Sequence, residues 1–85
     1  MAVKADLGER TLAQLAEGEI ARVVAIQTAD PELATKLREI GFSEGDEVEL
    51  ITYGPFGRQP LAVRLNRTIV AMRTAEASAI RVQAP

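Results

Sequence analysis

The chain has 85 residues, a net charge of −2 and a pI of about 5.1. We expect one domain over residues 1–85, with a polar leader over 1–10. Cysteine and histidine do not occur, which excludes disulfides, thiolate metal sites and the usual general base. No apolar run approaches the ~20 residues of a transmembrane helix, and the polar start does not resemble a signal peptide. We therefore expect a cytoplasmic protein without direct membrane insertion.

The first predicted elements are a helical turn and a strand. Thr11 and Gln14 have the spacing of a capping box, which begins a helical turn. Gly18 is a suitable glycine to end that turn. The run Ile20–Gln27 is rich in β-branched residues, which indicates a strand with two partly apolar faces.

A short α-helix is predicted next. Asp30 is a suitable N-cap, and Pro31 fits the first helical position. The apolar stripe of this helix consists of Leu33, Leu37 and Ile40. Gly41 ends the helix in the left-handed conformation, and Phe42 supplies the hydrophobic contact that accompanies such an ending.

The remaining sequence predicts a turn over 43–46, three hairpin-linked strands over 47–53, 61–65 and 68–73, a polar helical turn over 74–79 and a last strand over 80–82. A glycine- and proline-rich loop over 54–57 joins the first two hairpin strands, and a two-residue turn at Asn66-Arg67 joins the next two. The fold class is mostly β. We expect a small barrel of about five strands, with one short α-helix and one or two helical turns.

Five short motifs occur in order along the chain. They are Leu12-x-x-Leu15-x-x-Gly18, Leu33-x-x-x-Leu37-x-x-x-Gly41-Phe42, Gly45-Asp46-x-Val48, Gly54-Pro55-x-Gly57-x-x-Pro60 and Ile69-Val70-Ala71-Met72-Arg73-x-x-Glu76-Ala77-x-x-Ile80-x-Val82. Together they resemble the FeoA family over about 12–82, although Asn66 stands where a glycine is expected. The resemblance implies an SH3-like barrel. It also implies a small accessory and regulatory protein of bacterial ferrous iron uptake.

The partner that the resemblance implies is FeoB, a membrane ferrous-iron permease with a cytosolic GTP-binding domain. An alternative is a detached relative of the C-terminal SH3-like domain of metal-dependent repressors. The chain shows neither a DNA-binding helix-turn-helix nor a metal-ligand cluster that would support that alternative.

Catalysis finds no support in the residues. Ser43 and Ser78 have no histidine to activate them, and the loop over 54–57 lacks the lysine and hydroxyl residue of a phosphate-binding loop. We predict that the protein is not an enzyme and assign no catalytic residue and no cofactor. Carboxylates gather at Glu44, Asp46, Glu47 and Glu49, but an amphipathic strand places such residues toward solvent, and we assign no metal site.

Binding of single-stranded nucleic acid is a second alternative, because small barrels stack bases on aromatic side chains inside basic grooves. Only three residues are aromatic. We therefore expect no nucleic-acid partner.

A protein-binding surface is the favoured interpretation, with Phe56 as its aromatic anchor on the glycine- and proline-rich loop. The candidate partner-binding residues are Tyr53, Phe56, Arg58, Arg64 and Arg67. Phe56 folded back to plug the end of the barrel is the competing interpretation.

The charge distribution suggests an acidic partner, with one alternative. Residues 1–50 hold five basic and eleven acidic residues (−6), and residues 51–85 hold five basic and one acidic (+4). The alternative is that the arginines of the later strands simply face solvent. The sequence leaves open the oligomeric state, whether the partner is activated, inhibited or assembled, and whether iron or nucleotide controls binding.

Overall fold

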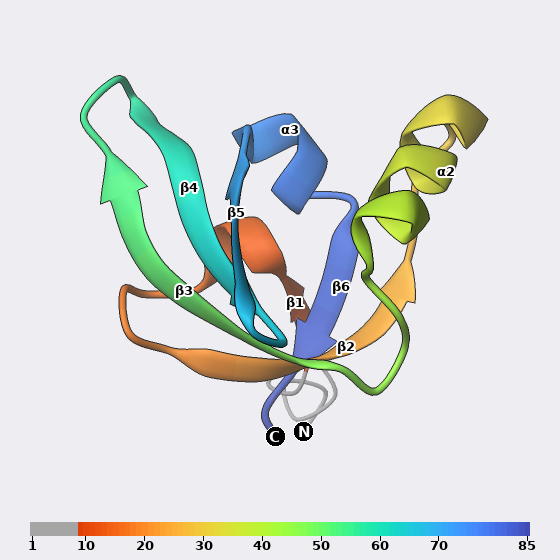
Figure 1. Ribbon diagram of the computed structural model, residues 1–85, viewed down its shortest axis with the longest axis horizontal. Helices are drawn as coiled ribbons and strands as arrows, with labels where there is room; N and C mark the ends of the chain where they lie inside the picture. The colour runs from red at the N-terminus through yellow and green to blue at the C-terminus, as the bar shows by residue number, and fades with distance from the viewer. Residues whose placement is uncertain (1–8) are drawn as a thin grey trace, which may run out of the picture.

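The computed structural model describes residues 9–85, which form one curved antiparallel sheet with short helical segments (Figure 1). The strands are β1 (Glu9–Thr11), β2 (Ile20–Ile26), β3 (Glu47–Gly54), β4 (Arg58–Leu65), β5 (Thr68–Met72) and β6 (Ile80–Gln83). The helical segments are the 3₁₀ turn η1 (Leu12–Gln14) and the α-helices α2 (Pro31–Ile40) and α3 (Thr74–Ala77). The sheet has the order β1-β6-β2-β3-β4-β5. The prediction of a mostly β fold is confirmed.

The edge strand β1 was not predicted. Residues 1–8 of the expected polar leader lie outside the described residues, and the rest of the leader enters the sheet, where Arg10 pairs with Val82 of β6. A three-residue polar strand has no apolar alternation to reveal it. Its pairing partner lies at the other end of the chain, so the signal is not local.

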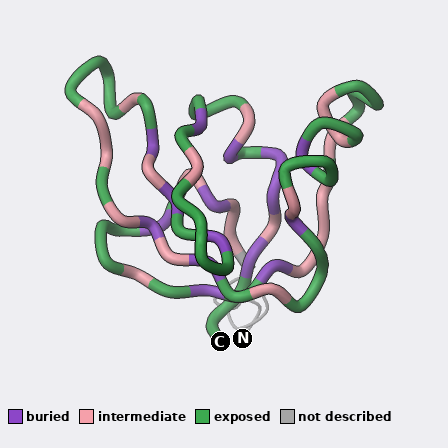
Figure 2. The backbone as a smooth tube through the Cα atoms, in the orientation of Figure 1, coloured by how far each residue is buried: buried purple, intermediate pink, exposed green. Residues whose placement is uncertain are grey.

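The core fills the concave side of the sheet and contains only apolar residues (Figure 2). Alternate residues of β3 and β4 point into it, as predicted from their alternation of apolar and polar residues. The buried residues are Leu12, Leu15, Ala21, Val23, Leu37, Phe42, Val48, Leu50, Leu61, Val63, Leu65, Met72, Ala77, Ala79, Ile80 and Val82. Within the described residues, no polar or charged residue is buried, so the barrel is held by burial of apolar surface.

Helix α2 has the predicted ends but packs less closely than expected. The carboxylate of Asp30 accepts hydrogen bonds from the backbone N–H groups of Glu32 (3.0 Å) and Leu33 (3.4 Å). Gly41 ends the helix with φ of +127°, and Phe42 is buried beside it. In the predicted apolar stripe only Leu37 is fully buried, and Ile40 is 38% exposed. The helix therefore lies beside the sheet (Figure 1) and contacts the core through a narrow seam.

The β3–β4 hairpin consists of the two longest strands of the sheet, and unusual backbone conformations occur at both ends of β4. A Cβ on Gly54 would lie 2.2 Å from the backbone oxygen of Gln59, so only glycine fits there. Gly57 and Arg58 both have positive φ, and β4 begins at Arg58, three residues before the predicted start. At the other end of β4, Asn66 has φ of 57°, which explains why asparagine stands at that turn.

Candidate partner-binding surface

Phe56 lies at the tip of the β3–β4 hairpin and is 79% exposed. The ring therefore does not plug the barrel, and that interpretation is wrong. Figure 2 shows the hairpin tip as an exposed segment at the upper left, away from the core. An exposed ring of this size costs solvation free energy that a binding partner would recover.

An open groove of about 490 Å³ runs beside Phe56, between the hairpin tip and the start of α3. Its lining residues are Phe56, Gln59, Pro60, Arg73 and Ala75. The backbone N–H of Thr74 donates to Oε1 of Gln59 at 2.7 Å, which ties the start of α3 to β4 and shapes the groove. The groove thus combines apolar side chains with the positive charge of Arg73.

Arg73 was missed as a candidate, although a signal for it was present. The two-residue turn at Asn66-Arg67 sets Leu65 opposite Thr68 and Leu61 opposite Met72. The next pair in this register joins Pro60, one residue before Leu61, to Arg73, one residue after Met72. The groove forms at that pair.

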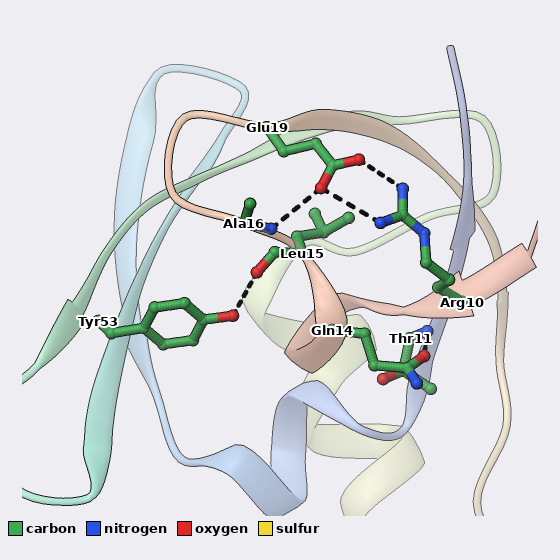
Figure 3. A network of polar contacts seen from close by, with 7 residues as sticks. All are labelled: Arg10, Thr11, Gln14, Leu15, Ala16, Glu19 and Tyr53. Atoms are coloured by element: carbon green, nitrogen blue, oxygen red, sulfur yellow. Dashed lines mark hydrogen bonds and ion pairs between the residues drawn. The ribbon is translucent and has the colours of Figure 1, made fainter.

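Tyr53 lies close to the tip of the hairpin, one residue before the end of β3, and is half-buried against the core. Its hydroxyl donates to the backbone oxygen of Leu15, just after η1 (Figure 3). The hydroxyl also lies 3.3 Å from the backbone oxygen of Ala13 in η1. The guanidinium carbon of Arg58 lies 3.8 Å from the centre of the ring, a cation–π contact. Tyr53 thus anchors the hairpin to η1 and holds Arg58, and its ring presents little free surface to a partner.

Glu17 also fixes the hairpin, and nothing in the sequence pattern indicated it. Its carboxylate accepts hydrogen bonds from the backbone N–H of Tyr53 (2.9 Å) and the hydroxyl of Thr52 (2.8 Å). These bonds, with the charge of Arg58, lower the pKa of Glu17 below its usual value. The interaction joins residues 36 apart in the sequence, so no local spacing could reveal it.

Arg64 and Arg67 lie at the other end of β4. Arg64 is six residues from Arg58, a distance of about 20 Å along a strand. Nε of Arg64 lies 3.4 Å from Oε1 of Glu49 on β3, and Arg67 is exposed in the β4–β5 turn. The structure therefore separates the five candidate residues into a tip group of Tyr53, Phe56 and Arg58 and a distant pair.

The acidic and basic parts of the sequence are interleaved in space. Lys36 pairs with Glu76 at 2.6 Å and Arg64 pairs with Glu49, and each ion pair joins the first 50 residues to the rest. A further pair joins Arg10 to Glu19, beside η1 (Figure 3). The charge asymmetry of the sequence is thus partly cancelled at the surface.

Neither a cluster of metal ligands nor a helix that could span a membrane occurs in residues 9–85. No three side chains of the aspartate, glutamate, histidine or cysteine type lie together there in a way that could hold a metal ion. No helix in the same range has both the length and the apolar character to cross a bilayer.

Solved structures share this fold, and they are SH3-like barrels. FeoA of Stenotrophomonas maltophilia, solved with zinc and described as a prokaryotic SH3 domain protein, is 37% identical with a TM-score of 0.77, over 87% of this chain and 89% of that one. FeoA of Chlorobium tepidum is 27% identical with a TM-score of 0.78, over 88% and 70% of the two chains. The predicted SH3-like fold is confirmed.

The family model of the FeoA domain matches residues 10–84, and the chain belongs to the FeoA family. The family and its fold support an accessory role in iron transport. A comparison with curated proteins found no match.

A manganese-dependent transcriptional repressor shares the fold only. Its TM-score is 0.82 at 23% identity, over 91% of this chain and 42% of the repressor chain. The predicted likeness to a repressor domain is thus a likeness of fold, and it carries no argument for regulation of transcription.

Proposed function

We propose that this protein acts in the cytoplasm as a regulatory accessory of ferrous iron uptake, by binding the cytosolic part of a FeoB-type permease. Membership in the FeoA family supports the transport role. The observation that carries the binding proposal is the 79% exposure of Phe56. Its hairpin tip is fixed by the hydrogen bonds of Tyr53 and Glu17. A rigid aromatic anchor loses little conformational entropy on binding, which is typical of interface hot spots.

The partner's surface is expected to combine an apolar pocket with acidic residues. Phe56, Pro60 and Ala75 line the groove with apolar surface, while Arg73 lies within it. Arg58 is held nearby over the ring of Tyr53. A pocket for the ring flanked by carboxylates would satisfy both parts of this surface.

Binding of the purified protein to the purified permease, measured by calorimetry or biolayer interferometry, tests the proposal. Phe56→Ala should weaken binding about 30-fold, the equivalent of about 2 kcal/mol for an interface anchor. Arg73→Glu should weaken it further by placing an acid against acidic surface. Ile40→Ala and Arg38→Glu on α2 are matched controls, because both residues are exposed and distant from the tip.

Two different failures are informative. A wild-type protein that does not bind the permease refutes the partner. A wild-type protein that binds, with both groove variants binding equally well, refutes this surface and leaves the partner intact. Affinity that falls steeply with salt and extends to single-stranded oligonucleotides would instead favour the nucleic-acid alternative.

A further inference from the structure

A row of four side chains crosses the outer face of the sheet at the end of β4 opposite the tip. Strand register places Ile20 of β2 beside Glu49 of β3, Glu49 beside Arg64 of β4, and Arg64 beside Ile69 of β5. We call this set the outer row. Its ends are two of the large apolar residues that face solvent, with Ile20 43% and Ile69 57% exposed.

The centre of the outer row is the ion pair between Glu49 and Arg64. A depression of about 230 Å³ lies beside it, lined by Ile20, Glu47, Val48, Glu49, Arg64 and Asn66. The neighbouring cross-strand pair toward the tip is Ala62 and Ala71, whose small side chains leave room for another surface to approach. The face is thus apolar at its margins, charged at its centre and open beside the charges.

The order apolar, acidic, basic, apolar is complementary to itself. Consider a two-fold axis that lies between two facing sheets, runs along the strands and passes through the middle of the row. It sets Ile20 against Ile69 of a second copy and Glu49 against Arg64 of that copy. Every contact then occurs twice, as in any isologous interface.

We propose that two copies of this chain form a symmetric dimer through the outer row. Glu49 and Arg64 exchange partners across the interface, and Ile69 of each copy packs at the depression beside Ile20 of the other. Arg22 and Arg67 are exposed at the margin, where salt screens their repulsion. The face is small, so we expect a reversible dimer with a dissociation constant on the order of micromolar.

Charge reversal tests the proposal directly, by sedimentation equilibrium of the full chain over a concentration series. Glu49→Arg sets two arginines against two arginines, and Arg64→Glu sets two acids against two acids. Each single variant should weaken dimerisation at least tenfold. The double variant E49R/R64E restores the self-complementary order and should dimerise like the wild type.

Mixing the two single variants provides a second, independent readout. Each is repelled by itself but complements the other, so an equimolar mixture should form a 1:1 heterodimer. Arg38→Glu on α2 is the control for charge reversal elsewhere, and circular dichroism checks that each variant is folded. Surface ion pairs contribute little to stability, so the single variants should fold.

A wild-type chain that stays monomeric at several hundred micromolar overturns the proposal. So does a dimer that both single variants leave unchanged, because the interface must then lie elsewhere. Single variants that lose binding to the permease while the wild type is monomeric would assign this face to the permease, which also overturns it. The sedimentation experiment contains no permease, so its result is independent of the proposed function.

Discussion

The two ends of β4 present different kinds of surface, although they belong to one strand. At the tip end, an exposed aromatic ring stands on a hairpin that Tyr53 and Glu17 tie to the segment around η1. At the turn end, Arg64 and Glu49 form an ion pair between neighbouring strands. In the function proposed above, the first surface binds a different protein. In the dimer proposed above, the second binds a copy of itself.

Together, the two proposals assign a different partner to each end of one small barrel. Among the described residues the core is entirely apolar, and neither the ring of Phe56 nor the outer row is part of it. The two groups are separated by about 20 Å of strand, which is enough for their effects to be additive. Substitutions at one end should therefore leave the other unchanged, and the predictions below test that separation.

Gly54→Ala should produce the largest effect at the tip end. The new Cβ would lie 2.2 Å from the backbone oxygen of Gln59, so the hairpin must open or shift. We expect a loss of about 3 kcal/mol in the free energy of unfolding, as for severe overpacking. Urea denaturation followed by circular dichroism measures this loss.

The matched control for Gly54→Ala is Gly57→Ala, in the same hairpin. At Gly57 a Cβ meets nothing within 4 Å, but φ is +65°. Its cost should be only the conformational one of about 1 kcal/mol. Equal losses for the two variants would show that the close approach at Gly54 is relieved without cost.

Tyr53→Phe should have a moderate effect, because it removes only the hydroxyl that bonds to the backbone of Leu15. A partly buried hydrogen bond of this kind contributes about 1 kcal/mol to the free energy of unfolding. The ring and its contact with Arg58 remain. Denaturation measures the loss, and hydrogen exchange at the η1 segment should become faster. Unchanged exchange there would contradict the role of Tyr53 as an anchor between hairpin and η1.

Much of the fold could be predicted because its signals are local. Asp30, Pro31 and Gly41 define the ends of α2 by their own chemistry, and the structure confirms all three. Strand β1 could not be predicted, because its three polar residues become a strand only when β6 is present to pair with them. Non-local pairing leaves no periodic trace in so short a segment.

The candidate surface was predictable in part. The position of Phe56 on a turn was clear, but its exposure was not, because the sequence does not show which aromatic residue of the hairpin packs against the core. The structure shows that it is Tyr53. Arg64 and Arg67 were grouped with Phe56 because they are close in sequence. In a strand, however, each residue adds about 3.3 Å, so residues at the two ends of β4 lie far apart. Glu17 belongs to the tip only through its contacts with Thr52 and Tyr53.

Acid should weaken the tip end through Glu17. Its pKa in the folded state is below the usual 4.5, because Tyr53 N–H and the Thr52 hydroxyl donate to the carboxylate. The unfolded chain therefore binds more protons in acid, so this stabilisation is complete above about pH 4.5 and is lost as the pH falls through the lowered pKa. Glu19 and Glu76 also have lowered pKa values and add to the same trend.

The contribution of Glu17 can be isolated by comparing unfolding at pH 7 and pH 3.5. Glu17→Gln should reduce the difference between the two free energies of unfolding. A wild-type stability that is the same at both pH values would contradict the assignment for all three carboxylates.

Phe56→Ala should have the smallest effect on folding, and for that reason it is the most direct test of the tip. A side chain that is 79% exposed makes few contacts to lose, so the free energy of unfolding should change by less than about 0.5 kcal/mol. The dimerisation of the outer row should also be unchanged, because the two surfaces are at opposite ends of β4. A loss of stability above about 1 kcal/mol would mean that the ring packs against the barrel in solution. Its exposure could then no longer support a role as a binding anchor.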